Sequence, residues 1–367
     1  MEMKRMCMLL LCLLLTFTGA SAASEELLAE QSEALGLDGL SDAAGEYGPG
    51  TDVAGVDLDD GLQGILEEGQ AAAGGVIRKA ARSGVLLLAV VLLASLAQGT
   101  WETAGEGIGL QVVPMAAAAA ITVIAVSDAN SLIGMGRETL ERMETFGQIL
   151  LPTMAAATAL GGSPGGAAAR QFAAMLFSNL LLTVINGFLL PLTYGYIAAC
   201  AACAAVGNEG LKRLAGVLKW VVTMVLTILL LTYVGYLTVS GVVAGTADAV
   251  AVKAARFTVS SMVPVVGGIL SDAAETVLAG AGVLKNAVGV FGMLTILSIC
   301  LVPFLQLGIH YLTYKLTGAL AATVADGRVA GLIDQIGSAF GLVLGMTGAS
   351  ALLLLVSMVS AVSMSSP

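Results

Sequence analysis

Long apolar segments separated by few charges constrain this chain more than any other feature. Apolar residues make up 57% of its 367 residues and charged residues only 11%, and the mean hydropathy is +0.92. A soluble domain carries roughly 25% charged residues, so one water-soluble core cannot bury this much apolar surface. The composition therefore excludes a soluble globular enzyme and a disordered chain, and it indicates a protein that folds in a lipid bilayer.

Eight apolar segments are candidates for membrane crossing, because a helix needs about 20 apolar residues to span the bilayer. Continuous runs, rather than short alternating strands, predict helices and not a barrel. We expect an all-α fold, a polytopic transmembrane helical bundle of about seven or eight spans, with a turn at Pro191. The segments are 86–97, 110–126, 146–160, 172–190, 192–206, 217–239, 288–309 and 340–362.

The first 23 residues have the pattern of a secretory signal peptide. Lys4 and Arg5 precede an apolar run over 7–17, and small residues at Ala20 and Ala22 suit cleavage after Ala22. Residues 1–23 are therefore expected to be a signal peptide, which places residue 24 outside the cytoplasm.

The net charge of −10 arises in one N-terminal segment. Residues 24–77 hold thirteen Asp and Glu and no Lys or Arg. This segment has few large apolar residues, so we expect an acidic extracytoplasmic arm that does not form a catalytic domain. Two membrane parts, 78–239 and 288–367, follow it on either side of 240–287. No basic patch suits nucleic acid, which is excluded as a partner.

Basic residues gather in two short polar links, 207–219 and 310–338. Short links rich in Lys and Arg stay in the cytoplasm. An odd number of crossings must then separate the start of the chain from 207–219, and the eight-segment layout supplies five. The same layout places 240–287 on the far side of the membrane from the cytoplasm. Two features oppose it, since Arg78, Lys79 and Arg82 would lie outside and the acidic link at 99–109 inside.

The segment 240–287 carries charges between two strong apolar spans. Its apolar residues from Val243 to Phe257 recur at helical spacing on one stripe, and its charges fall off that stripe. We take the charges as candidates for partner contact or for a pathway through the membrane. They are Asp248, Lys253, Arg256, Asp272, Glu275 and Lys285.

A break divides 240–287 into two amphipathic helices. Pro264, Gly267 and Gly268 interrupt the pattern, and Asp272 with Glu275 resembles a restarting helix cap. Either both helices lie along the outer membrane surface with their charges toward water, or the pair dips into the bilayer and returns, which requires cover from neighbouring helices.

Three stretches of this region resemble the stage III sporulation protein AE family of endospore-forming Firmicutes. They are VSGVVAGTAD at 239–248, PVVGGILSD at 264–272 and KNAVGVFG at 285–292. The resemblance implies a multi-pass protein of the mother-cell membrane around the forespore. It also implies work with the other stage III A-operon proteins and forespore stage II protein Q in a trans-envelope channel, or feeding tube. The family has no assigned catalytic residues, so we expect no enzyme activity and no cofactor.

Other functions receive less support from the residues. A stand-alone secondary transporter would suit one broken helix, but no matched repeat is visible. An intramembrane serine hydrolase would need Ser240 and His310 to meet. His310 ends a span and is expected at the membrane interface, and with one histidine no metal site is expected.

Small residues at helical spacing suggest close helix packing. Cys200 and Cys203 are expected to pack in an apolar helix and not to act as a redox pair. Glycine ladders run over 241–245 and 337–345. We expect these ladders to serve packing within the chain, with a homo-oligomer interface as the alternative.

Overall fold

The computed structural model describes residues 29–49, 53, 55–103, 112–160, 173, 176–262, 267–325 and 327–363. Side chains are described for these residues except 100–103, 112, 114, 237–281 and 360–363. The expected signal peptide lies outside the described residues. Within them the fold is all-α, as the sequence predicts, and no strand is present in the described ranges.

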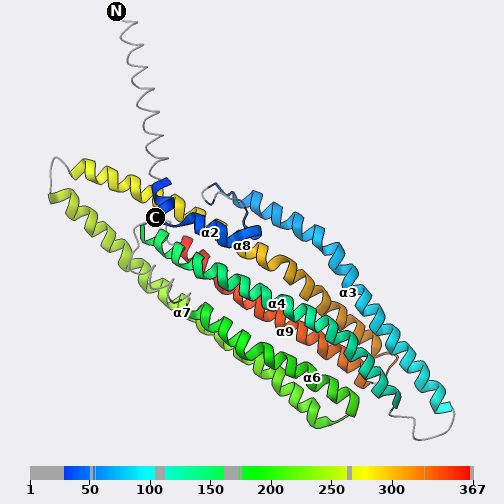
Figure 1. Cartoon of the computed structure of the whole chain (residues 1–367). Helices are drawn as coiled ribbons and strands as arrows, with labels where there is room; N and C mark the ends of the chain where they lie inside the picture. The colour runs from blue at the N-terminus through cyan, green and yellow to red at the C-terminus, as the bar shows by residue number, and fades with distance from the viewer. Residues whose placement is uncertain are drawn as a thin grey trace, which may run out of the picture.

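Long helices that alternate in direction form the bundle (Figure 1). A short helix and a 3₁₀ turn precede them, and a π-helical turn, η3, interrupts the third long helix. The elements are α2 (Leu37–Ala44), η1 (Gly45–Tyr47), α3 (Leu58–Thr103), α4 (Val112–Leu160), η3 (Ile185–Leu189), α6 (Leu190–Val206), α7 (Glu209–Met262), α8 (Gly267–Ala321) and α9 (Gly327–Ser363).

Two helix turns mark one end of the bundle. The turn at 207–208 joins α6 to α7, the turn at 322–325 follows α8, and the side chain of Arg328 packs against Gly207. We call this the turn end, at the lower right of Figure 1. The opposite end is the tip end, where α7 ends at Met262 and α8 begins at Gly267.

The described helices include six that are long and apolar enough to cross a membrane, fewer than the eight segments of the sequence. Residues 112–126 and 146–160 belong to one helix, α4, since the polar stretch between them is itself helical. Its charged residues 137, 138, 141 and 142 are exposed, while Leu132, Leu140 and Met143 are buried in the core. Amphipathic periodicity thus continues the helix where hydropathy falls.

Pro191 does not make the expected turn. Residues 176–206 form one continuous helical span, with Pro191 at the first turn of α6, directly after the π-helical turn η3. Proline has no backbone N–H to donate to the carbonyl oxygen four residues earlier, so it interrupts the hydrogen bonds of an α-helix. A π turn changes the bonding register at that point, so the helix passes Pro191 without reversing.

In the structure three helices long enough to span the membrane precede the link at 207–219, where the sequence predicts five. Three is also an odd number, as the basic residues of the link require. The link at 310–338 is mostly helical, because α8 continues to Ala321 and α9 begins at Gly327. The break near 264 does separate two helices, but each one is continuous with a neighbouring span. Both helices of 240–287 are therefore the tip-end parts of α7 and α8.

The helices α8 and α9 lie at the centre of the fold. They bury 50% and 56% of their most apolar stretches, whereas α7 buries 11% and faces outward. A Cβ added to Gly337 of α9 would lie 2.9 Å from the Tyr314 Cβ of α8, and one on Gly341 would lie 3.0 Å from the Tyr311 ring. This part of the glycine ladder packs within the chain, as expected.

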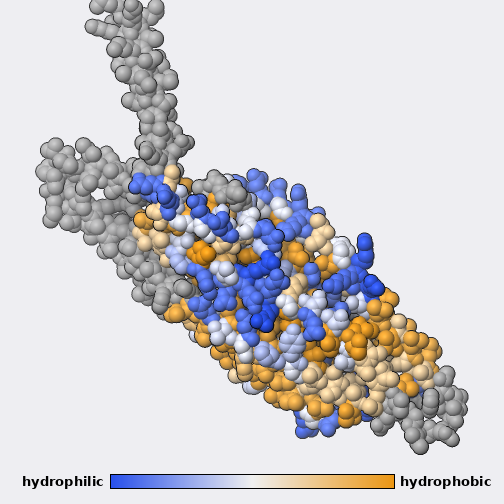
Figure 2. Space-filling view, in the orientation of Figure 1, coloured by the Kyte–Doolittle hydropathy of each residue, from blue (hydrophilic) through white to orange (hydrophobic). Residues whose placement is uncertain are grey.

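Exposed side chains divide the bundle along its axis (Figure 2). Most exposed large apolar side chains of α3, α4 and α8 lie near the turn end, and we call these the apolar belt. Leu58, Leu66, Ile77, Ile149, Leu160 and Val283 are exposed beyond it. The belt reaches from the turn end to Val85 of α3 and Phe304 of α8, ~27 Å at 1.5 Å per residue. The hydrocarbon core of a bilayer is about 30 Å thick. The belt consists of Val85, Leu86, Leu92, Leu93, Leu96, Met115, Val123, Val126, Phe304, Leu312, Leu316 and Leu320.

Beyond the belt, toward the tip end, exposed charges cover α3, α4 and η1. This polar face is the blue area of Figure 2. It carries eight acidic and five basic side chains, so its net charge is negative. They are Glu46, Asp57, Asp59, Asp60, Glu67, Glu68, Glu138 and Glu141, with Arg78, Lys79, Arg82, Arg137 and Arg142.

Candidate functional site

Arg142 organises the polar face from the middle of α4. Its Nη2 lies 2.9 Å from Oε1 of Glu138, one turn earlier on the same face. The i,i+4 spacing of the two residues on a helix favours this pair. Arg137 pairs in the same way with Glu141, at 2.9 Å. Each pair links two exposed side chains, so by itself it stabilises the helix only slightly.

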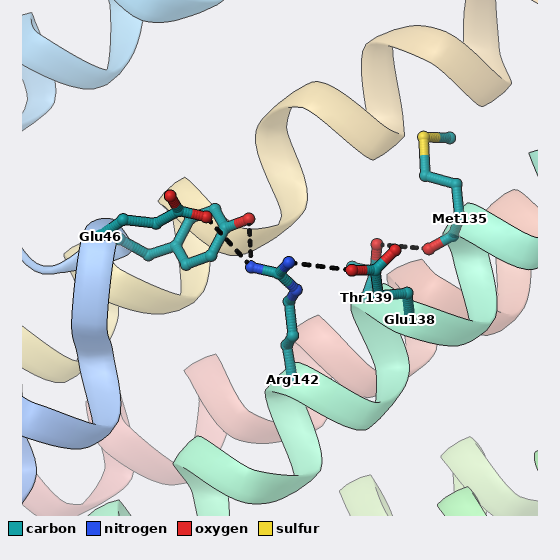
Figure 3. Close-up of polar contacts among 6 residues, drawn as sticks. Glu46, Met135, Glu138, Thr139 and Arg142 are labelled. Atoms are coloured by element: carbon teal, nitrogen blue, oxygen red, sulfur yellow. Dashed lines mark hydrogen bonds and ion pairs between the residues drawn. The ribbon is translucent and has the colours of Figure 1, made fainter.

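The N-terminal acidic segment reaches Arg142 through η1 (Figure 3). Nη1 of Arg142 lies 3.2 Å from Oε1 of Glu46, and it donates a hydrogen bond to the Tyr47 hydroxyl at 2.5 Å. The guanidinium carbon lies 5.0 Å from the centre of the Tyr47 ring, within reach of a cation–π interaction. Arg142 therefore joins two elements that are 95 residues apart in the sequence.

Local structure fixes where Glu46 and Tyr47 stand. Leu37, Leu40 and Ala44 of α2 are buried against the core, and α2 packs on α4. Gly45 ends α2 at φ +54, a left-handed conformation that favours glycine. The turn presents Glu46 and Tyr47 to α4. The described part of the arm thus contributes to the core.

Asp57 connects the arm to α3. Its Oδ1 accepts a hydrogen bond from the Asp59 backbone N–H at 2.8 Å, so Asp57 caps a helix that begins at Leu58. The stretch at 57–60, which resembles a loop in the sequence, is a helix start. The described part of 24–77 therefore includes the first twenty residues of α3.

Partial burial raises the pKa of the Tyr47 phenol above its ordinary value, and a hydrogen bond with Glu46 raises it further. The positive charge of Arg142 acts in the opposite direction but is the smaller influence. Tyr47 is thus neutral at physiological pH, and its oxygen can accept the Arg142 hydrogen bond without adding charge.

Three clefts meet at Glu46 and Tyr47. The first, of about 540 Å³, lies between η1, the start of α3 and Ser298 of α8. The second, of about 370 Å³, extends along Glu138 and Arg142, and the third, of about 580 Å³, follows α2 and α4. Acidic side chains such as Glu46, Glu68 and Glu138 and apolar side chains such as Met135 and Ile299 both line these hollows. Such a mixed surface suits a partner segment that carries positive charge beside apolar groups.

A second polar group lies within the apolar belt. Nζ of Lys315 on α8 lies 2.8 Å from Oδ1 of Asp334 on α9, and it donates to Ser338 Oγ at 2.8 Å. Two charged residues at membrane depth are expensive unless they pair. The pair therefore ties the two central helices together inside the belt.

The predicted contact residues lie at the tip end. Asp248, Lys253 and Arg256 fall in the last part of α7, and Asp272 and Glu275 in the first turns of α8. Their side chains, and Pro264, lie outside the described part; Gly267 and Gly268 begin α8. Lys285 is described, and it is 3% exposed. A contact or pathway role for these residues stays a prediction.

The structure corrects two ideas about His310. The expected interfacial residue is buried, with 1% exposure. Ser240 lies 31 residues from the turn end on α7, and His310 lies 11 residues from it on α8, so the two are ~30 Å apart along the axis. They cannot form a hydrolase pair. Cys200 is buried, and it and Cys203 are free thiols, in keeping with a packing role.

A family model described as Stage III sporulation protein AE matches residues 70–365. The chain belongs to the stage III sporulation protein AE family. The protein of that name from Bacillus subtilis (strain 168) is 25% identical over 218 residues, 59% of this chain and 54% of that protein. The chain therefore aligns with about half the length of this relative. No solved structure matches.

The AE-family match covers Arg142 and all of α4, α6, α7, α8 and α9, but it begins after Glu46 and Tyr47. The half of the site on α4 thus lies in the family region, and the half on η1 lies outside it. Sequence reasoning found Arg142 and Glu138 from helical spacing. It missed Glu46 and Tyr47, for which the glycines on both sides of the pair, Gly45 and Gly48, were the available signal of a fixed turn.

Proposed function

We propose that this chain is a non-enzymatic, multi-pass component of the channel complex that joins mother cell and forespore during endospore development. Membership of the AE family and six helices suited to membrane crossing support a membrane protein of sporulation. The observation that carries the finer proposal is the division of the bundle. A belt close to bilayer thickness holds it in the membrane, and a polar face with clefts stands beyond the belt for contact with other proteins.

The orientation follows from the basic residues. Lys212 and Arg213 near the start of α7, and Arg328 at the start of α9, lie at the turn end, and Lys219 follows ten residues into α7. Since basic residues beside spans stay cytoplasmic, the turn end faces the mother-cell cytoplasm. The polar face and the tips of α7 and α8 then face the space between mother cell and forespore.

The partners proposed for these surfaces are the other stage III A-operon proteins and forespore stage II protein Q. The excess of acidic over basic side chains on the polar face, eight against five, favours partner surfaces with positive charge. The charges at the tips of α7 and α8 provide a second contact region, in which Asp248, Lys253, Arg256, Asp272, Glu275 and Lys285 are the candidates and Pro264, Gly267 and Gly268 shape the break.

Charge reversal on the polar face tests the proposal in sporulating cells. Arg142→Glu removes the contact that fixes η1, and Arg137→Glu is the matched control, since Arg137 pairs only within α4 among its described contacts. Both variants must reach the membrane in equal amounts. We expect Arg142→Glu to reduce late forespore gene expression and recovery of the stage III A-operon proteins with the chain. Equal function of both variants would contradict the role of this face.

The same assay tests the tip end. Reversing Asp248, Lys253 and Arg256 together, and Asp272 with Glu275 in a second variant, should weaken assembly of the complex. If both variants sporulate normally, the tip charges have no contact role. Uptake of a solute by the purified chain alone in liposomes would instead favour a stand-alone transporter over a component of a complex.

A further inference from the structure

His310 carries a ring nitrogen that no described side chain or backbone group satisfies. Its side chain is 1% exposed, and Nδ1 lies 2.7 Å from the carbonyl oxygen of Gln306, one turn earlier on α8. A carbonyl only accepts, so the hydrogen bond assigns the proton of the neutral ring to Nδ1. Nε2 then holds a bare lone pair, and it is buried without a hydrogen-bond partner among the described residues.

A carboxylate lies at the same helix junction. Tyr314, one turn after His310 and fully buried, donates its hydroxyl proton to Oδ2 of Asp128 on α4 at 2.7 Å. His310 and Tyr314 both meet the Phe340 ring of α9 edge-on, with ring centres 6.5 and 4.9 Å away. Helices α4, α8 and α9 thus enclose an imidazole, a phenol and a carboxylate.

The charges that act on the His310 ring come from two other helices. Burial of the ring in the core opposes its protonated form most strongly. The Gln306 carbonyl and the negative charge of Asp128 on α4 favour that form, and the positive charge of Lys79 on α3 opposes it. On α8 the neighbouring titratable groups are Tyr314 and Lys315, of which Lys315 pairs with Asp334. From α9 the ring meets the apolar side chain of Phe340.

The group lies within the depth of the apolar belt. His310 is 11 residues from the turn end on α8 and Asp128 is 16 residues from it on α4, so they stand ~17 Å and ~24 Å above that end. Buried polar atoms in native proteins nearly always find a partner. An ionisable group at membrane depth is also costly, so it is a candidate for a functional role.

We propose that His310, with Asp128 as its counter-charge, is a proton-binding site inside the bundle. A hydronium ion or water supplies the proton, its O–H bond breaks, and the Nε2 lone pair forms the new N–H bond. The resulting imidazolium keeps its Nδ1–H bond to Gln306, and the Asp128 carboxylate balances its charge. This site does not depend on the proposed partners. It places between α4, α8 and α9 a group that gains a positive charge when it binds a proton.

Labelling with ¹⁵N-histidine tests the site directly, because the chain has one histidine. The full chain, purified in nanodiscs through a tag without histidine, gives imidazole signals from His310 alone. We expect the signals to change reversibly between pH 8 and pH 5 from a ring protonated at Nδ1 to one protonated at both nitrogens. A ring that stays neutral throughout, with Nε2 held by an ordered water, would overturn the proposal.

Two carboxyl variants separate the site from a general effect of pH. Asp128→Asn should weaken proton binding about tenfold, a shift of about one pH unit, because the counter-charge is lost. Asp334→Asn is the control, since this carboxylate lies in the same belt but pairs with Lys315, and it should leave the midpoint unchanged. Equal midpoints in the two variants would overturn the role of Asp128.

If Asp128→Asn fails to fold, Tyr314→Phe offers a second variant, which retains the Asp128 carboxylate but removes its hydrogen bond from the phenol. Without the phenol hydrogen bond, the carboxylate charge is less stabilised and attracts the imidazolium more strongly. The midpoint should therefore move to higher pH. A midpoint unchanged by Tyr314→Phe would show that the carboxylate does not act on His310.

Discussion

Arg142 of α4 lies 3.2 Å from Glu46 of η1, and this ion pair attaches the N-terminal acidic segment to the membrane bundle. The attachment is strengthened by the Tyr47 hydroxyl and ring, which the same guanidinium contacts. The segment expected to be an independent arm is thereby a fixed part of the polar face. Its negative charge stands beside the clefts between η1, α3 and α8.

Loss of the Arg142 side chain should release η1 from α4. Exposed ion pairs contribute about 0.2–1 kcal/mol each, so Arg142→Ala should lower global stability only slightly. We expect faster hydrogen exchange of backbone amides over 37–47, measured by mass spectrometry, while exchange in α8 stays the same. Arg137→Ala is the control. If it accelerates exchange over 37–47 as much as Arg142→Ala does, the contact is not what holds η1.

The close approach of α8 and α9 should make Gly337 intolerant of a side chain. A Cβ at this position would lie 2.9 Å from the Tyr314 Cβ and 3.4 Å from the Lys315 backbone nitrogen. Overpacking of this kind typically costs about 1–3 kcal/mol, so Gly337→Ala should lower the thermal midpoint of the protein in detergent.

Gly331→Ala, six residues earlier on α9, is the matched control for Gly337→Ala. An added Cβ there meets nothing within 4 Å, and alanine favours a helix over glycine by up to about 1 kcal/mol. Gly331→Ala should be neutral or stabilising. Equal midpoints for the two variants would contradict the packing of α8 on α9.

The Lys315–Asp334 pair should depend on both charges. Lys315→Ala leaves Asp334 without its ion-pair partner within the belt, and a loss of about 1 kcal/mol is expected, since both side chains retain partial exposure. Exchanging the two residues, Lys315→Asp with Asp334→Lys, should recover part of the loss. Chemical denaturation in detergent measures the stability of the single and double variants. A double variant that is less stable than either single one would refute the pairing.

The helical membrane fold could be predicted from the sequence because apolar runs and sparse charges allow few alternatives. The boundaries of the helices could not, and α4 shows why. Hydropathy separates 110–126 from 146–160, whereas the buried Leu132, Leu140 and Met143 continue the helix on one face. Pro191 likewise suggests a turn, but one π-helical turn before it suffices to continue the span.

The candidate sites divide in the same way between local and long-range contacts. The pair of Glu138 and Arg142 is one turn apart and could be found by spacing alone. The contacts of Arg142 with Glu46, and of Tyr314 with Asp128, bridge 96 and 186 residues. No local pattern marks such partners, since helix packing brings them together. His310 was placed at the interface because it ends an apolar run, but α8 continues for eleven residues beyond it.

Cysteine labelling tests the orientation of the bundle, on which the rest of the account depends. In a variant without its native cysteines, Glu68→Cys marks the polar face and Lys212→Cys marks the turn end, both at exposed positions. Asp248→Cys extends the test to the tip of α7. In intact protoplasts of non-sporulating cells that produce the chain in their plasma membrane, a membrane-impermeant maleimide should label Glu68→Cys and Asp248→Cys, and it should reach Lys212→Cys only after permeabilisation. Labelling of Lys212→Cys in intact protoplasts, with Glu68→Cys protected, would contradict the account.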